Sequence, residues 1–385
     1  MTAPCTPGPA PAIGITAAAL AALLARACPD HLLDLAGAVA LPCPLPHADA
    51  WRAFVGEGRH GGLEYLARDP EGRLDPTRRD AWAGALLVFA QRYTDGWPQG
   101  DADPAAGGPA GAADDPPWTA RVSRYARGRD YHDLLKGDIQ GAVAALARAL
   151  PGLHSRIAVD TGPYLEREYA WLAGLGFQGR NTCLIHEKLG SGMFLGVALV
   201  NLRVEGLPAP GVPATEPLYA VAARRRRAAP VAPASRCGSC TSCVEACPTQ
   251  AILPGGGLDA GRCLSMWTIE LRGEVPAGRD AEQGGLLFGC DICQAVCPWN
   301  AHAAAAPPAG LPPLRTGYAT LPSHAGLSLH DLASISDEDF AARFRRTPLW
   351  RCHPDGMRRN ARRVLANLER ATPAPTADDD VAGTP

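Results

Sequence analysis

The chain has 385 residues, 46% hydrophobic and 20% charged, so it is long enough for about two or three domains with buried cores. Its formal net charge of -2 excludes a uniformly basic coat for nucleic acid, although a local basic patch remains compatible with it. The 42 glycines and 37 prolines indicate that part of the chain is loop or low-complexity linker.

The N-terminal part predicts a mixed α/β arrangement. An amphipathic helix is predicted over residues 16–28, with Thr16 as its N-cap. A short apolar stretch follows, and then a helix around Ala48–Phe54 and a buried strand over residues 85–93. Residues 94–117 consist largely of Gly, Pro, Ala and Asp, which predicts a flexible insertion.

Order returns after this insertion. A long helix is predicted from Tyr131 with Asp130 as its cap, and a strand ending in a turn is predicted over residues 155–163. A helix that glycines terminate follows, and residues 193–204 predict one strong strand. Residues 205–235 are rich in proline and predict a linker or loop.

The C-terminal part predicts two helices joined around residues 353–356. Together with the composition changes, this divides the chain into an α/β (α+β) domain, a cysteine-rich domain, a short α-helical (HEAT-like) segment and a disordered tail. The predicted boundaries are 1–235 (with insertions at 94–117 and 205–235), 236–305, 306–370 and 371–385.

No apolar run reaches the roughly 18 residues that a membrane span needs. The apolar stretch near the N-terminus lacks preceding basic residues and is not typical of a signal peptide. We therefore expect a cytoplasmic protein that does not contact a membrane.

The 13 cysteines are unevenly distributed, since eight fall between residues 237 and 297. In a cytoplasmic chain of this size, cysteines predict metal or redox chemistry rather than disulfides. The simplest interpretation of the remaining five is that they are small buried hydrophobic residues. These five are Cys5, Cys28, Cys43, Cys183 and Cys352.

The spacing of the eight cysteines indicates two [4Fe–4S] clusters. The run C-x2-C-x2-C-x3-C-P starts at residue 237, and C-x2-C-x3-C-P starts at residue 290. In bacterial two-cluster ferredoxins the fourth cysteine of such a run binds the other cluster. Two zinc sites could also use eight cysteines, but this is not zinc-ribbon spacing. We assign Cys237, Cys240, Cys243 and Cys297 to the first cluster, and Cys247, Cys263, Cys290 and Cys293 to the second.

A candidate general acid precedes the cysteine runs in the sequence. Asp160 follows an apolar strand and precedes a tight turn, where a carboxylate facing a pocket can donate or accept a proton. Asp also favours turns and helix caps for structural reasons alone, and this alternative stays open. His132 lies in DYHDLLKG, which lacks the glycine of a cobalt-ligating signature, so we interpret it as structural.

Several long motifs, in this order, resemble the epoxyqueuosine reductase family over residues 12–370. They are SRYARGRDYH, VDTGPYLER, GFQGRNT, CGSCTSCVEACPTQAI, RCLSMWTIELRGEVP, GCDICQAVCPWN and FRRTPLWRCHPDGMRRNARRVLANL. The resemblance implies a cobalamin-binding α/β domain, a ferredoxin-like domain with two [4Fe–4S] clusters and a helical-repeat segment. It also implies reduction of the epoxide of epoxyqueuosine at the tRNA wobble position to queuosine, the final step of queuosine biosynthesis.

By the same resemblance, Asp160 matches the proton donor of the family, and we expect burial to raise its pKa. The segments implied to line the cobalamin or substrate site contain Arg68, Arg124, Tyr125, Asn181 and Thr182. The chain departs from the family pattern at Gly162, where Ala is common, and at Phe177, Gln178 and Arg180 in GFQGRNT. These changes concern substrate fit more than cluster binding.

The implied partners are tRNA and an external low-potential electron donor, and we expect a monomer. Residues 341–370 contain nine arginines against two acidic residues, which predicts a basic patch for phosphates, although a solvated helix face is the alternative. Two other functions remain open. One is a cobalamin-dependent reductive dehalogenase-like enzyme, and the other is a two-cluster electron-transfer ferredoxin without its own catalysis.

Overall fold

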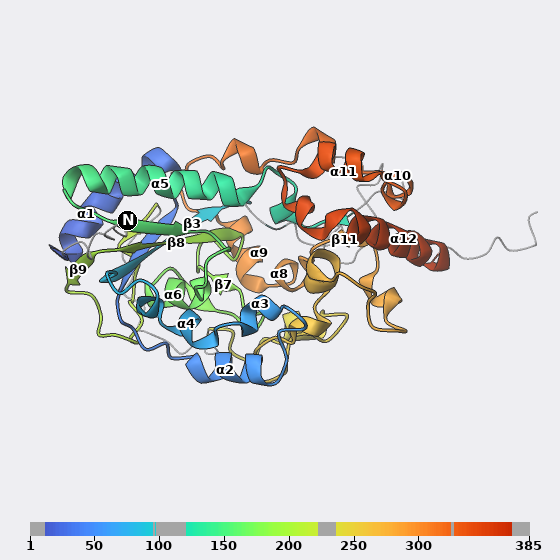
Figure 1. Cartoon of the computed structure of the whole chain (residues 1–385), viewed down its shortest axis with the longest axis horizontal. Helices are drawn as coiled ribbons and strands as arrows, with labels where there is room; N and C mark the ends of the chain where they lie inside the picture. Colours follow the sequence, from blue (N-terminus) through green and yellow to red (C-terminus); the bar gives the residue numbers. More distant parts are fainter. Residues whose placement is uncertain (1–11, 95–96, 98–120, 222–235, 325–326, 372–385) are drawn as a thin grey trace, which may run out of the picture.

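The computed structural model describes residues 12–94, 97, 121–221, 236–324 and 327–371 (Figure 1). Its first half is built on a five-stranded sheet of order β10-β2-β3-β8-β5, in which every neighbouring pair is antiparallel. The mixed α/β class is therefore confirmed. The strands are β2 (Leu35–Ala40), β3 (Ala85–Arg92), β5 (Ser155–Ala158), β8 (Met193–Val200) and β10 (Tyr219–Ala220).

Helices cover both faces of this sheet (Figure 1). Successive side chains of a strand point to opposite faces, so Phe89 of β3 lies in one core and Val88 in the other. Helices α1 (Ala17–Ala27) and α5 (Tyr131–Ala149) pack on the first face. Residues from α2 (Ala48–Gly56), α4 (Pro70–Leu74) and α6 (Glu166–Leu172) pack on the second.

Both predicted caps are confirmed. The Thr16 hydroxyl accepts a hydrogen bond from the backbone N–H of Ala19 at 3.2 Å, and the Asp130 carboxylate accepts one from His132 N–H at 3.0 Å. Helices α1 and α5 therefore begin directly after the cap residues predicted from the sequence, which satisfy N–H groups that the first helical turn leaves unpaired.

The single strand predicted over residues 193–204 is wrong, because the chain changes sheets at Asn201. The fully buried Asn201 side chain accepts from His154 N–H and donates to the Gly152 carbonyl. After this break, β9 (Leu202–Glu205) leaves the central sheet and pairs in parallel with β1 (Ile13–Thr16).

The cysteine-rich part contains short elements joined by turns. They are α7 (Ser242–Glu245), a helical turn over Met266–Glu270, β11 (Leu286–Phe288), α8 (Ile292–Ala295) and α9 (Pro298–Ala305). Strand β11 pairs in parallel with β4 (Arg121–Val122), which precedes α5. This pairing ties the cysteine-rich part to the N-terminal half.

The C-terminal helices share a core with β11 and β4 (Figure 1). They are α10 (Leu329–Ala333), α11 (Asp337–Phe344) and α12 (His353–Ala371). Residues 353–356 were predicted to join two helices, but they form the first turn of α12, and the join lies over residues 345–352. Part of the predicted linker is ordered as β10, whereas most of the 94–117 insertion and the 371–385 tail lie outside the described residues.

Candidate active site and cluster ligands

The structure brings four cysteines of the first predicted set together. Burial first, and then the neighbouring charges of Cys237, Cys297 and Cys240, raise the pKa of the Cys243 thiol to about 11. Three of these residues come from the first run and Cys297 from the second. The arrangement supplies the four thiols that one [4Fe–4S] cluster needs.

The second predicted set also lies together. Burial raises the pKa of the Cys290 thiol, and interaction with Cys263 and Cys247 adds to this effect. The thiol of Cys293 interacts with those of Cys290 and Cys263. Buried thiols resist ionisation on their own, so the positive charge of bound iron is what would hold them as thiolates. The two groups are therefore candidate ligand sets for the two expected clusters.

A cavity of about 220 Å³ separates the central sheet from the second group of cysteines. Its lining includes Phe194 and its neighbours on β8, Tyr125, Tyr131 and Gln294 of α8. Tyr131 and Phe194 stack with their ring planes 3° apart. The mostly apolar, aromatic lining suits one face of a flat macrocycle such as the corrin ring of cobalamin.

Cys183 joins this cavity to the second group. It lines the cavity, and its thiol is in hydrogen-bond contact with that of Cys293. The interpretation of Cys183 as a merely buried hydrophobic residue is therefore wrong. The sequence contained no spacing signal for it, because Cys183 lies in the loop between β6 (Phe177–Gln178) and β7 (Leu184–Ile185), far along the chain from the cysteine runs.

Asp160 lies in the turn after β5, with its backbone in the left-handed region at φ 56°. Its carboxylate accepts a hydrogen bond from the Tyr131 hydroxyl at 3.0 Å and lies 3.4 Å from His132 Nε2. Its backbone N–H donates to the Glu166 carboxylate at 2.9 Å. The carboxylate is 65% exposed, so it can reach a bound molecule, and Tyr131 links it to the cavity wall.

The expectation of a raised Asp160 pKa is wrong. The hydrogen bond from His132 is the largest influence on Asp160, and it lowers the pKa of that carboxyl group. Burial lowers the pKa of His132, but its contacts with Asp130 and Asp160 outweigh burial and raise it to about 9. His132 Nδ1 lies 2.7 Å from the Asp130 carboxylate. At neutral pH the proton therefore resides on His132, which we had interpreted as only structural.

A second acidic side chain, Glu166, contacts this pair through the backbone of Asp160. Burial raises the pKa of Glu166 to about 8, and the charge of Asp160 adds to the effect. The hydrogen bond from Asp160 N–H to the Glu166 carboxylate places this acid beside the Asp160–His132 pair.

The other predicted site residues lie in different places. Tyr125 lines the cavity. Asn181 is buried and donates to the Cys293 carbonyl at 3.1 Å, so it contacts the cluster-ligand segment. Thr182 accepts from Arg167, which lines the cavity.

Arg124 and Arg68 lie outside this cavity lining. The backbone N–H of Arg124 donates to Asp291, and its guanidinium lies 5.3 Å from the Trp97 ring centre. Arg68 is exposed at the end of the short helix α3 (Glu64–Ala67).

An exposed aromatic residue, Tyr65, and an exposed basic residue, Arg351, interact with Asp160. Tyr65 was not among the predicted site residues. Tyr65 of α3 is 41% exposed, and the charge of Asp160 contributes to the raised pKa that burial gives its hydroxyl. Arg351 interacts with both residues while it makes a two-bond contact with Glu270. A further contact comes from the Arg346 carbonyl, which accepts from Asp130 N–H.

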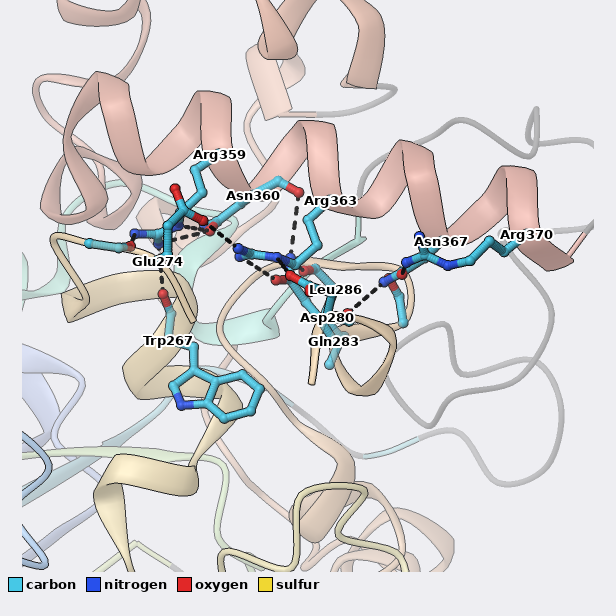
Figure 2. A network of polar contacts seen from close by, with 12 residues as sticks. Trp267, Glu274, Asp280, Gln283, Leu286, Arg359, Asn360, Arg363, Asn367 and Arg370 are labelled. Atoms are coloured by element: carbon cyan, nitrogen blue, oxygen red, sulfur yellow. Dashed lines mark hydrogen bonds and ion pairs between the residues drawn. The ribbon is translucent and has the colours of Figure 1, made fainter. Parts of the chain in front are cut away.

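Several arginines expected to form a phosphate-binding patch are instead used inside the protein (Figure 2). Arg359 donates to three backbone carbonyls, and Arg363 is 8% exposed and pairs with Asp280 and Glu274. Arg358 pairs with two acidic side chains. These three arginines therefore stabilise the fold, and the phosphate-docking role predicted for the segment does not extend to them.

Residues 236–300 match the family model described as "4Fe-4S double cluster binding domain". With the two groups of four cysteines, this defines the chain as a two-cluster iron–sulfur protein. Residues 73–161 match a second family model, "Epoxyqueuosine reductase QueG, DUF1730".

Relatives and solved structures extend the match across the chain. Epoxyqueuosine reductase of Burkholderia pseudomallei is 35% identical over 85% of this chain and 76% of its own. Epoxyqueuosine reductase of Synechocystis sp. is 35% identical over 66% of this chain and 77% of its own. A crystal structure of epoxyqueuosine reductase with a tRNA-Tyr epoxyqueuosine-modified stem loop is 26% identical, covers 92% of this chain and 83% of that one, and has a TM-score of 0.72. The chain belongs to the epoxyqueuosine reductase family.

Proposed function

We propose that this chain reduces the epoxide of epoxyqueuosine in tRNA to the alkene of queuosine. The observation that carries the proposal is the convergence of the Asp160–His132 pair, the aromatic cavity and the second group of cysteines. Family membership supports the substrate, and it favours this reaction over a dehalogenase or a ferredoxin without catalysis.

The overall reaction consumes two electrons and two protons and releases the epoxide oxygen as water. We propose that Cys237, Cys240, Cys243 and Cys297 would hold the first cluster and Cys247, Cys263, Cys290 and Cys293 the second. When bound, the two clusters would supply one-electron transfer from an external low-potential donor, with the second cluster nearer the cavity. The contact of Cys293 with Cys183, which lines the cavity, supports the place of the second group beside the cavity.

We propose that the cavity receives part of cobalamin, with Tyr125 and Phe194 against the ring and Arg167 at the polar edge. When bound, cobalamin supplies the strongly reducing centre that removal of the epoxide oxygen requires. The protein residues orient the substrate, exclude water from the apolar wall and supply protons. Arg68 and Arg124 lie outside this lining and remain candidates for contacts farther from the ring.

Proton delivery is assigned to the coupled pair of His132 and Asp160. His132 Nε2 holds the proton at neutral pH and faces the Asp160 carboxylate, which is exposed toward the substrate side. As charge develops on the departing oxygen, the His132 proton moves to the Asp160 carboxylate, and Asp160 passes a proton on to that oxygen. Asp130 orients the imidazole through Nδ1.

This assignment predicts a pH dependence. Because the pKa of His132 is raised to about 9, the imidazolium is present below that pH and is lost as the pH rises through it. We expect the single-turnover rate of the wild type to fall above about pH 9. His132→Gln should lower the rate and remove this limb of the profile. Profiles of the same shape for wild type and His132→Gln would exclude His132 as the proton reservoir.

Two exposed residues near Asp160, Tyr65 and Arg351, together with the exposed arginines that precede Arg351, form the surface that we propose docks the tRNA stem loop. Tyr65 offers an aromatic face for a base, and Arg345, Arg346 and Arg351 offer positive charge for phosphates. Trp350 is 39% exposed beneath Arg345. The wobble nucleotide would then lie close to the acid that acts on it.

We further infer that residues 1–235 bind cobalamin, 236–305 form a ferredoxin-like domain and 306–370 a HEAT-like docking segment. The protein is proposed to act as a cytoplasmic monomer. In the part of the chain that the structure describes, no helix has both the length and the apolar character needed to cross a membrane.

The reaction can be tested by anaerobic turnover of cluster-reconstituted protein with cobalamin, a strong reductant and epoxyqueuosine-containing tRNA. Nucleosides from the digested tRNA are then analysed by mass spectrometry. We expect loss of one oxygen from the modified nucleoside to give queuosine. An unchanged nucleoside with iron and cobalt fully loaded would show that the substrate assignment is wrong.

A further inference from the structure

Asn360 of α12 is fully buried and links two segments that are separate in the chain. Its side-chain amide donates to the Thr268 carbonyl at 2.8 Å and to the Leu287 carbonyl at 3.0 Å. Its own Oδ1 accepts from the neighbouring Arg359 guanidinium at 2.9 Å. All the polar groups of this amide are therefore used.

Both of these segments carry cysteines of the second group. Thr268 lies in the helical turn that follows Cys263, and Leu287 lies in β11, which leads directly to Cys290. A further connection comes from the fully buried Thr268 hydroxyl, which donates to Leu264 O at 2.7 Å and accepts from Gly289 N–H at 2.9 Å. Asn360 and Thr268 thus connect the residues beside Cys263 with those beside Cys290.

Arg359 holds the far end of the same helical turn. Its guanidinium donates to the carbonyls of Trp267, Leu271 and Gly273, each at 2.7 Å. Helix ends leave carbonyl groups without intrahelical partners, and a cation there is favourable. The turn that begins beside Cys263 is therefore fixed from α12 at both Thr268 and its C-terminal end.

We propose that Asn360 is a positioning residue of the second cluster, which sets the separation of the Cys263 and Cys290 thiols from outside the cysteine runs. This C-terminal segment was predicted to form a helical repeat and a basic patch for phosphates, and neither role concerns the clusters. The inference rests on the proposed assignment of Cys247, Cys263, Cys290 and Cys293 to one cluster. It does not depend on the substrate, because its test measures iron rather than turnover.

The same helix provides a matched control. Asn367 also donates through Nδ2 to two carbonyls, those of Asp280 at 3.1 Å and Gly284 at 3.0 Å. The segment that it holds contains no cysteine. Asn360→Asp and Asn367→Asp make the same chemical change, since each replaces an amide donor with a carboxylate facing carbonyl oxygens.

Each cluster can be observed separately in a background that lacks the other. Cys240→Ala leaves only the second cluster, and Cys290→Ala leaves only the first, each with about four iron atoms per chain. We would add Asn360→Asp or Asn367→Asp to each background, reconstitute the proteins anaerobically and measure the rate of iron release to a chelator. Thr268→Val, which keeps the shape but removes the hydroxyl, serves as a second variant. Circular dichroism melting monitors the fold.

We expect Asn360→Asp and Thr268→Val to accelerate iron release at least about 10-fold in the Cys240→Ala background. In the Cys290→Ala background, Asn360→Asp and Thr268→Val should release iron at the rate of the Cys290→Ala parent. Asn367→Asp should release iron at the parent rate in both backgrounds. Equal acceleration in the two backgrounds, in step with a lower melting temperature, would overturn the proposal in favour of general stabilisation. Unchanged release in both would also overturn it. If the Cys240→Ala parent holds no cluster, the assignment of the cysteines fails instead.

Discussion

Asp160→Asn is expected to lower the single-turnover rate by at least about 100-fold while both clusters and cobalamin remain bound, because general acid catalysis contributes about 10²- to 10⁴-fold. The amide keeps the size of the carboxylate and can still accept from the Tyr131 hydroxyl, which lies 3.0 Å from the Asp160 carboxylate. It cannot accept the His132 proton and pass it on. The measurement is conversion of epoxyqueuosine-containing tRNA under reducing conditions, with iron and cobalt contents determined on the same samples.

Asp133→Asn provides the control for this experiment. Asp133 is an exposed acid in the first turn of α5, close in sequence to His132. Its loss changes the net charge of the region by the same amount, and we expect near-normal turnover. A rate for Asp160→Asn close to that of Asp133→Asn would exclude Asp160 as the proton donor. A rate that recovers as the pH is lowered would mean that a proton from solvent can substitute.

Cys290→Ala is expected to abolish turnover entirely, since it removes a ligand of the cluster that we place next to the cavity. Burial already raises the pKa of the Cys290 thiol, so a bound iron ion is what would keep it ionised. We expect iron to fall from about eight to about four atoms per chain. The signal of the first cluster should persist in the electron paramagnetic resonance spectrum of the reduced protein.

Cys28→Ala is the matched control because Cys28 is fully buried and lies in neither group of cysteines. Burial raises the pKa of its thiol to about 12, so it stays protonated and unreactive. This variant should keep about eight iron atoms and normal turnover. Full iron content in Cys290→Ala would remove Cys290 from the ligands.

Much of the site could be predicted from the sequence because the signals are local. The spacing of the cysteine runs reflects how a short loop wraps a cubane, and the structure brings the same eight thiols into two groups. Helix caps are also local, so Thr16 and Asp130 were found at the correct ends. Asp160 was found because a carboxylate after an apolar strand is a short-range pattern.

Only the tertiary structure decided what surrounds these groups. The pKa of Asp160 is lowered rather than raised because α5 brings His132 to it from another part of the chain. Arg363 looks like a phosphate ligand in a basic run, but folding buries it against Asp280 and Glu274. Asn360 carries no local signal at all.

The physical reason is the range of the interactions. Caps and ligand spacing depend on a few neighbouring residues, so the sequence by itself determines them. A pKa, a buried ion pair or an amide that joins two loops depends on burial and on partners that are distant in the chain. For this protein, the sequence determined the spacing of the eight cysteines, and the packing of α5 and α12 decided the partners of Asp160 and the contacts of Asn360.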